Sequence, residues 1–121
     1  MSRLILVVED QEDNRRIIRD LLSALDYELA EAENGVEALA AVAKQKPQLI
    51  LMDIQMPIMD GYEATRRIKA NPELRTIPIV VVTSYALSGD EQKALACGAD
   101  CYVAKPFSPL ELLAKINGYL K

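Results

Sequence analysis

The sequence contains no histidine and no tryptophan, and it has only one phenylalanine and two cysteines. Without histidine the chain cannot form a phosphohistidine, use an imidazole as a general base or hold a metal through imidazole nitrogens. Cys97 and Cys101 are too few for a disulfide framework, and without further cysteine or histidine they cannot complete a zinc site. We therefore expect both to be small buried hydrophobic residues in a reducing compartment.

Long apolar runs and basic clusters are also missing. No run approaches the roughly 18 apolar residues that a membrane span needs, and the N-terminal MSRLILVVED becomes acidic too soon for a secretory signal. A formal net charge of -4 without a basic cluster argues against nucleic acid as a direct partner, because phosphate contacts supply most of that affinity. The 121 residues, 50% hydrophobic and 26% charged, suit one globular domain over residues 1–121, which we expect to be cytoplasmic.

Strands and helices alternate along the chain. Short aliphatic or β-branched runs predict strands at residues 4–8, 27–33, 49–53, 77–82 and 101–104. The run 27–33 alternates apolar and charged residues like an edge strand, whereas 4–8 and 49–53 are continuously apolar and therefore central. Helical crossovers between them make the sheet parallel. The expected fold class is α/β, a five-stranded parallel sheet of order 2-1-3-4-5 that five helices doubly wind.

Capping residues and apolar stripes predict the helices. A capping residue followed three positions later by a glutamate predicts the start of a helix. The sequence has three such pairs: Asn34 with Glu37, Asp60 with Glu63, and Ser88 with Glu91. The apolar faces are expected at Ile17, Ile18, Leu21, Leu22 and Leu25 of the first helix, Tyr62, Thr65 and Ile68 of the third, and Leu112, Leu113, Ile116 and Leu120 of the fifth. The fourth helix, ended by Gly98, is short and alanine-rich, with Leu87 and Leu95 as its main apolar anchors, so we expect it to be mobile.

Acidic residues stand at the carboxyl ends of two central strands. Glu9 and Asp10 follow the first strand, and Asp53 ends the third, within the stretch LILMDIQMPIMDG. Open α/β sheets bind ligands at these ends, where the strand order reverses, so we expect the three carboxylates to converge. Like charges raise one another's pKa values unless a cation joins them, and a site of few oxygen ligands favours Mg²⁺ over Ca²⁺.

Thr83 and Lys105 stand at the ends of two further strands on the same edge of the sheet. Asp53 alone could be an ordinary solvated loop residue. A hydroxyl, an ammonium group and a metal ion around one carboxylate, however, can stabilise a phosphoryl group that moves to a carboxylate oxygen. The combination therefore predicts phosphoryl chemistry at Asp53.

The motifs VVED, LILMDIQMPIMDG and VVVTSYALSGDEQKALACGADCYVAKPF, with their spacing, resemble the receiver domain of bacterial two-component response regulators over essentially the whole chain. The resemblance implies a CheY-like, flavodoxin-like fold and a role in phosphorelay signalling. The segments SYALSGDEQKA and YVAKPFSP resemble, more narrowly, DivK-like single-domain regulators of cell-cycle and polarity control. A receiver cut from a larger hybrid kinase or effector fits the same motifs.

The resemblance also implies a phosphoacceptor and a metal site. Asp53 resembles the phosphoacceptor, and Asp10 resembles a direct Mg²⁺ ligand. Glu9 resembles the second acid, which acts through water, although the family more commonly has aspartate there and the longer side chain leaves the metal contact open. The backbone carbonyl of Gln55 is similar to the third protein ligand.

Four further positions carry implied roles. Thr83 resembles the hydroxyl switch residue, and Lys105 resembles the residue that pairs with phosphoryl oxygens. A cis peptide before Pro106 would aim the lysine into the site. Tyr102 resembles the aromatic residue whose rotamer follows phosphorylation.

The implied partners are proteins. Because the chain has no histidine, the phosphoryl group is expected from the phosphohistidine of a histidine kinase or a histidine phosphotransfer protein. Phosphorylation would reshape the surface of the fourth helix, fifth strand and fifth helix, which would contact a downstream target protein or form a phosphorylation-dependent dimer. We expect no output domain after the last helix, and the expected activity is slow autophosphorylation and autodephosphorylation at most, not that of an enzyme.

Three alternatives fit the residues less well. A Mg²⁺-dependent aspartyl phosphohydrolase resembling the haloacid dehalogenases needs a second acid two residues after its nucleophile, where this chain has Gln55. A flavin-binding module needs a phosphate-binding loop rich in glycine, serine or threonine, whereas residues 9–12 are mainly acidic and would repel the phosphate. An inactive pseudo-receiver would have lost at least one of the core positions, and all are present.

Overall fold

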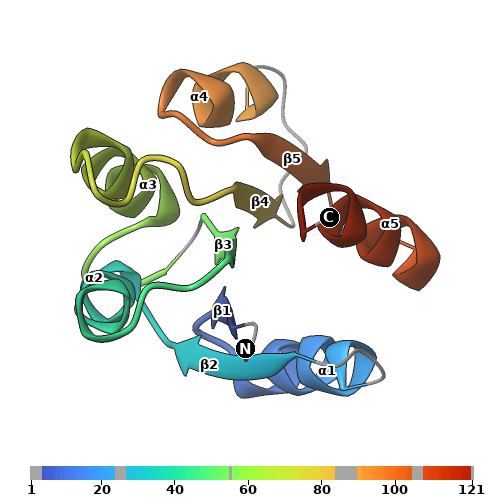
Figure 1. Ribbon diagram of the computed structural model, residues 1–121. Helices are drawn as coiled ribbons and strands as arrows, with labels where there is room; N and C mark the ends of the chain where they lie inside the picture. The colour runs from blue at the N-terminus through green and yellow to red at the C-terminus, as the bar shows by residue number, and fades with distance from the viewer. Residues whose placement is uncertain (1–3, 24–26, 55, 84–89, 105–107, 121) are drawn as a thin grey trace.

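The computed structural model describes residues 4–23, 27–54, 56–83, 90–104 and 108–120, excluding the side chains of Thr83, Asp90, Glu91 and Ala104. Its parallel sheet has the order β2-β1-β3-β4-β5 and consists of β1 (Leu4–Val8), β2 (Glu28–Ala32), β3 (Leu49–Asp53), β4 (Ile79–Thr83) and β5 (Cys101–Ala104). One face is covered by α1 (Glu12–Leu22) and α5 (Pro109–Leu120), and the other by α2 (Gly35–Lys44), α3 (Gly61–Ala70) and α4 (Asp90–Ala96) (Figure 1). The predicted fold class and strand order are confirmed.

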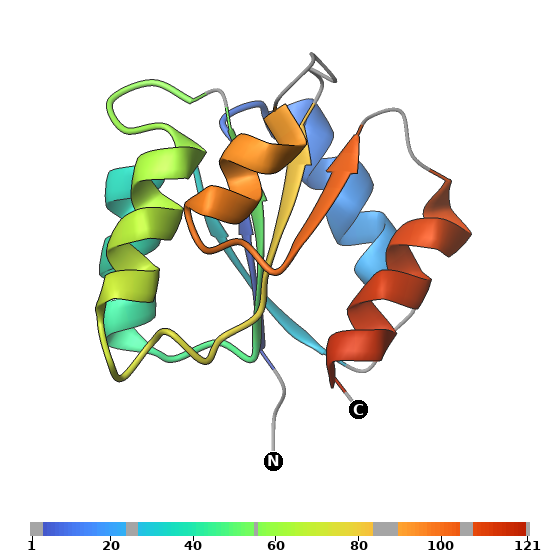
Figure 2. The ribbon, with the colours of Figure 1, turned by 90° about the horizontal axis from the view of Figure 1, so that it is seen from above.

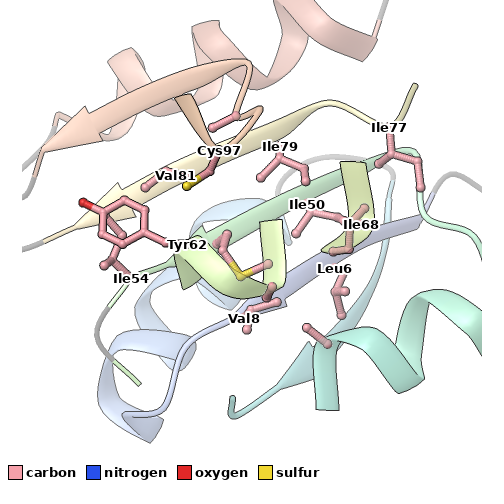
Figure 3. Packing of buried hydrophobic residues seen from close by; sticks show 14 of the residues in the cluster. Leu6, Val8, Ile50, Ile54, Tyr62, Ile68, Ile77, Ile79, Val81 and Cys97 are labelled. Atoms are coloured by element: carbon pink, nitrogen blue, oxygen red, sulfur yellow. The ribbon is translucent and has the colours of Figure 1, made fainter. Parts of the chain in front are cut away.

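Strand side chains alternate between two hydrophobic clusters, one on each face of the sheet. The cluster under α2, α3 and α4 includes Leu6, Val8, Ile50, Met52, Ile79 and Val81 (Figure 3). The cluster under α1 and α5 includes Ile5, Val7, Leu49, Leu51, Val80 and Val82. Because both faces are buried, central strands are continuously apolar, while the edge strand β2 is not. This difference identified β1 and β3 as central strands and β2 as an edge strand, which favours the observed order.

The strand register brings the carboxyl ends of the strands to one edge of the sheet (Figure 2). Val8 of β1 lies opposite Met52 of β3, so the residues that follow them, Glu9 and Asp53, emerge side by side. On the other side of β3, Asp53 lies opposite Val82 of β4. Asp53 therefore occupies the middle of this edge.

Two predicted helix caps are confirmed. The side chain of Asn34 accepts a hydrogen bond from the backbone N–H of Glu37 at 2.9 Å, and that of Asp60 accepts one from the N–H of Glu63 at 2.9 Å. Each cap satisfies one of the N–H groups that a helix start leaves without a partner. Gly98 follows α4 with a φ of 105°, which only glycine adopts readily. The predicted cap at Ser88 lies outside the described residues.

Two predictions about helix packing are wrong. Ile17 is 60% exposed, whereas Ile18 and Leu22 lie on the side of α1 that meets the sheet. Consecutive residues of a helix differ in direction by about 100°, so Ile17 points away from that side. Leu95 is 46% exposed and does not anchor α4, whereas Ala94 is fully buried and does. Two further residues of these predictions, Leu25 of the first helix and Leu87 of the fourth, lie outside the described part of the chain.

Smaller differences concern β4 and the cysteines. Strand β4 begins at Ile79 and not at Ile77, because the N–H of Ile77 donates to the carbonyl of Leu74 at 3.0 Å in the preceding turn. Cys97 is buried as expected, but Cys101 is half-buried. Both are free thiols. Of the helices that the structure describes, none has both the length and the apolar character required to cross a lipid bilayer.

Candidate functional site

Three carboxylates converge at the carboxyl edge of the sheet. Glu9, Asp10 and Asp53 each offer an oxygen, and these oxygens all lie within 4.8 Å of one another. Glu9 is 2% exposed and Asp53 is 9% exposed, while Asp10 is half-buried. Negative charges this close together and this far from bulk water repel strongly, and a divalent cation relieves the repulsion. The predicted convergence is confirmed, and the donor set fits a hard, oxygen-preferring cation such as Mg²⁺.

The first acid of the cluster is held through its backbone and its side chain. The N–H of Glu9 donates to the carbonyl of Ala32 in β2 at 3.0 Å, which extends the ladder between β1 and β2 by one step. One carboxylate oxygen of Glu9 accepts from the N–H of Gln11 at 3.2 Å. The buried Glu9 carboxylate therefore has a defined direction before any cation binds.

Asp53 is positioned by the start of the loop between β3 and α3. Its Oδ1 accepts a hydrogen bond from the N–H of Ile54 at 2.9 Å, which restricts rotation of the carboxylate. The carbonyl of Ile54 in turn accepts from the N–H of Gly61 at 2.9 Å, so the first turn of α3 is joined to the end of β3. Asp53 therefore lies at the base of a loop that the hydrogen bond between Gly61 and Ile54 closes.

The tip of the same loop is a tight turn. The N–H of Met59 donates to the carbonyl of Pro57 at 2.7 Å, and the residue between them, Ile58, has a φ of 70°. The carbonyl of Met59 accepts from the N–H of Gly35 at 3.0 Å, which ties the loop to the start of α2. The side chain of Ile58 is 82% exposed.

A hollow of about 510 Å³ borders the acidic cluster. It is lined by Asp10, Ile54, Met56, Pro57, Asp60, Tyr62 and Lys93. The Nζ of Lys93 lies 4.9 Å from the centre of the Tyr62 ring, a cation–π contact that joins α4 to α3. The wall of the hollow therefore carries both an acid of the cluster and a positive charge from α4.

The remaining predicted residues are only partly described. Thr83 ends β4, with its backbone opposite Ala104 of β5. Tyr102 of β5 is half-buried and packs against the hydrophobic cluster under α2, α3 and α4. The side chain of Thr83 lies outside the described structure, as do Gln55, Lys105 and Pro106 with the predicted cis peptide. Their roles remain predictions.

Arg15 is a residue that the sequence analysis missed. It is 7% exposed, and its Nη1 donates to the backbone carbonyl of Glu9 at 2.8 Å. A signal was present in the sequence, because Arg15 precedes Ile18 by three positions and Leu22 by seven, which places it on the buried side of α1.

Comparisons with known proteins agree with this geometry. The family model for the response regulator receiver domain matches residues 5–117. A polar-differentiation response regulator, DivK, from Brucella anthropi is 41% identical over 120 residues, which cover 99% of this chain and 98% of that protein. DivK from Brucella ovis is 40% identical with the same coverage.

Two solved structures of receiver domains also resemble this chain, at somewhat lower sequence identity than the DivK proteins. The receiver domain of a sensor histidine kinase from Pseudomonas aeruginosa, with a magnesium ion coordinated in its active site cleft, superposes with a TM-score of 0.91 at 36% identity. That match covers 99% of this chain and 98% of the Pseudomonas chain. The signal receiver domain of a histidine kinase from Syntrophus aciditrophicus has a TM-score of 0.92 at 34% identity, covering 98% and 90% of the two chains. The chain belongs to the response regulator receiver domain family, the phosphoacceptor domains of two-component signalling.

Proposed function

We propose that Asp53 accepts a phosphoryl group from the phosphohistidine of a histidine kinase or histidine phosphotransfer protein. The observation that carries the proposal is the convergence of Asp53 with Glu9 and Asp10, whose oxygens lie within 4.8 Å of one another. In a chain of the receiver family, this cluster supports Asp53 as the acceptor. The chain has no histidine, so the donor belongs to a partner.

Mg²⁺ is the proposed cofactor of this site. Glu9, Asp10 and Asp53 would hold it together with the backbone carbonyl of Gln55. When bound, the ion neutralises charge on the oxygens of the phosphoryl group. The acidic cluster and the magnesium ion in the Pseudomonas receiver domain support this assignment.

The chemical step follows from the position of the Asp53 carboxylate. One of its oxygens attacks the phosphorus, the bond from phosphorus to the partner's imidazole nitrogen breaks, and an acyl phosphate forms. Lys105, which follows β5, would pair with the phosphoryl oxygens, and Thr83, at the end of β4, would donate its hydroxyl to them. Water later hydrolyses the acyl phosphate slowly, and this slow turnover is the full extent of the proposed catalytic activity.

The proposed output is a change of protein contacts on α4, β5 and α5. Tyr102 lies in β5 opposite Val81, half-buried, where an inward turn of its ring would follow a shift of Thr83. Leu95 and Leu110 expose apolar side chains on α4 and α5, at 46% and 78%. These exposed side chains support a contact with a downstream target protein or a second phosphorylated copy. Residues 1–121 would act as one receiver domain in the cytoplasm.

The test is phosphorylation by a small donor. The protein is incubated with acetyl phosphate and Mg²⁺, and its intact mass is measured at short times. We expect a Mg²⁺-dependent gain of about 80 Da, which corresponds to one added HPO₃ on a nucleophilic side chain. Inorganic phosphate is measured in parallel, so that rapid hydrolysis of the adduct is detected.

Two variants identify the acceptor. Asp53→Asn should abolish both the mass gain and any release of phosphate. Asp60→Asn is the matched control, because Asp60 lies in the same loop and asparagine can still cap α3 through its side-chain oxygen. A mass gain that persists in Asp53→Asn would overturn the assignment of the acceptor.

A further inference from the structure

Arg15 of α1 points its guanidinium at the loop that carries two acids of the cluster. Its Nη1 donates to the carbonyl oxygen of Glu9 at 2.8 Å, and the residue is only 7% exposed. That carbonyl belongs to the peptide unit that joins Glu9 to Asp10. A peptide unit is planar, so a bond that orients its carbonyl also orients the chain entering Asp10.

Acidic side chains hold the guanidinium in place. Its Nε donates to Glu31 at 3.2 Å, its Nη1 lies 3.4 Å from Glu33, and its Nη2 pairs with Glu12. Burial by itself lowers the pKa of Arg15, but the hydrogen bond with Glu12 and the charges of Glu33 and Glu31 outweigh burial and raise it. The guanidinium therefore stays charged and is fixed from several sides.

Glu9 is consequently held between two elements. Its N–H donates to Ala32 of β2, and its carbonyl accepts from Arg15 of α1. Loss of Arg15 would leave the hydrogen bond from the Glu9 N–H to Ala32 intact. The peptide unit between Glu9 and Asp10 would, however, lose the hydrogen bond that orients its carbonyl. The separation between the Glu9 and Asp10 carboxylates would then be less well defined.

We propose that Arg15 is a positioning residue of the cation site, which orients the peptide unit between Glu9 and Asp10 and thereby strengthens Mg²⁺ binding. The inference rests on the proposed function, because it takes Mg²⁺ as the ligand of the acidic cluster. Partners behind metal ligands commonly change affinity by 10- to 100-fold when they are removed. Arg15 acts here through the backbone of one ligand and not through its carboxylate.

Electrostatics alone predicts the opposite result. A positive charge near a cation site weakens cation binding, so its removal should strengthen binding. The two explanations therefore differ in the sign of the effect, which makes the proposal testable by one substitution.

Arg19 provides the matched control. It is one turn further along α1 and contacts Glu31 at 2.8 Å and Glu12 at 3.4 Å, two of the acids that hold Arg15. In the described part of the chain its hydrogen bonds do not extend to Glu9. Arg19→Met removes the same charge from the same acidic network and leaves the Glu9 carbonyl bonded.

The experiment measures Mg²⁺ affinity by isothermal titration calorimetry on the unphosphorylated protein at pH 7, with urea unfolding of each variant. We expect Arg15→Met to weaken Mg²⁺ binding about 10-fold or more, and Arg19→Met to leave it unchanged or slightly stronger. A purely structural role would lower the stability of both variants without separating their affinities. An Arg15→Met affinity equal to or tighter than that of Arg19→Met would overturn the proposal.

Arg15→Lys covers the case in which Arg15→Met does not fold. Lysine keeps the charge but cannot bond the Glu9 carbonyl and the surrounding acids through a planar fork. Weaker Mg²⁺ binding by Arg15→Lys would support the role in positioning, and unchanged affinity would overturn it. If the wild-type protein bound no Mg²⁺ at all, the metal assignment of the proposed function would fail, and this inference with it.

Discussion

A Cβ atom on Gly61 would lie 2.0 Å from the backbone carbonyl oxygen of Asp53. The first residue of α3 thus packs directly against the backbone of the proposed phosphoacceptor. Gly61→Ala must push these two backbone segments apart, and we expect it to lower the free energy of unfolding by about 1–3 kcal/mol. It should also weaken Mg²⁺ binding, because Asp53 moves. Urea unfolding and titration calorimetry measure the two effects.

Gly118→Ala is the control for this substitution. Gly118 lies in α5, and a Cβ there meets nothing within 4 Å. Alanine favours a helix over glycine, so the free energy of unfolding should rise by about 0.5–1 kcal/mol. Equal stability changes in the two variants would show that the contact between Gly61 and Asp53 is not tight.

Ile58 carries backbone strain at the tip of the loop between β3 and α3. Its φ of 70° is unfavourable for a β-branched residue, and its side chain is 82% exposed, so little packing offsets the strain. Glycine has no Cβ and adopts positive φ readily, so Ile58→Gly should raise the free energy of unfolding by about 1 kcal/mol. The same change at Ile17, which is exposed but helical, should stabilise nothing. A loss of stability in Ile58→Gly would contradict the prediction.

Thr65 is fully buried in α3, and its hydroxyl has no hydrogen-bond partner among the described residues. An unpaired buried hydroxyl is costly, and valine has nearly the same shape without it. We expect Thr65→Val to raise the free energy of unfolding by about 1 kcal/mol. Thr65→Ser keeps the hydroxyl and loses the methyl group, so it should lower that free energy by about 1 kcal/mol. Thermal and urea unfolding distinguish the two directions.

Glu31 should make stability depend on pH. A hydrogen bond from Arg19 holds the pKa of Glu31 below its ordinary value of 4.5 in the folded protein. As the pH falls, the unfolded chain therefore binds a proton before the folded chain does. The stabilisation by Glu31 is complete at neutral pH and disappears as the pH falls through the lowered pKa.

The variant Glu31→Gln tests this pH dependence. At pH 7 it should be less stable than the wild type by at most about 1 kcal/mol, because the ion pair is partly exposed. Below the lowered pKa, where the wild-type carboxylate becomes protonated, the difference should shrink towards zero. A difference that grows on acidification would have the wrong sign.

Mg²⁺ should reverse the effect of removing one acid from the cluster. Without Mg²⁺, Asp10→Asn relieves repulsion among Glu9, Asp10 and Asp53 and should raise the melting temperature. With Mg²⁺ at about 100 times its dissociation constant, the free energy of unfolding of the wild type should rise by about 2.7 kcal/mol. That of the variant should rise much less, because it binds Mg²⁺ more weakly. Thermal unfolding with Mg²⁺ and with EDTA measures both effects. Equal melting curves of the wild type in the two conditions would contradict a cation site.

Local pattern in the sequence predicted the strands, the central position of β1 and β3, and two helix caps. Continuous apolar runs indicate strands that are buried on both faces, and such runs identified β1 and β3 as central. Since carboxyl ends of parallel strands meet at one edge, the positions of Glu9, Asp10 and Asp53 along the chain were enough to predict that they converge.

The tertiary structure alone decided which residues support that cluster. The exposure of Ile17 and Leu95 depends on how far each helix is rotated on the sheet, and a periodic pattern defines that rotation only loosely. Helical spacing places Arg15 on the buried side of α1 but does not name its partner. The acceptor on Glu9 and the contact of Gly61 on Asp53 are both backbone atoms, which carry no residue-specific signal. The sequence therefore determined the acids of the site, and three-dimensional packing decided what holds them in position.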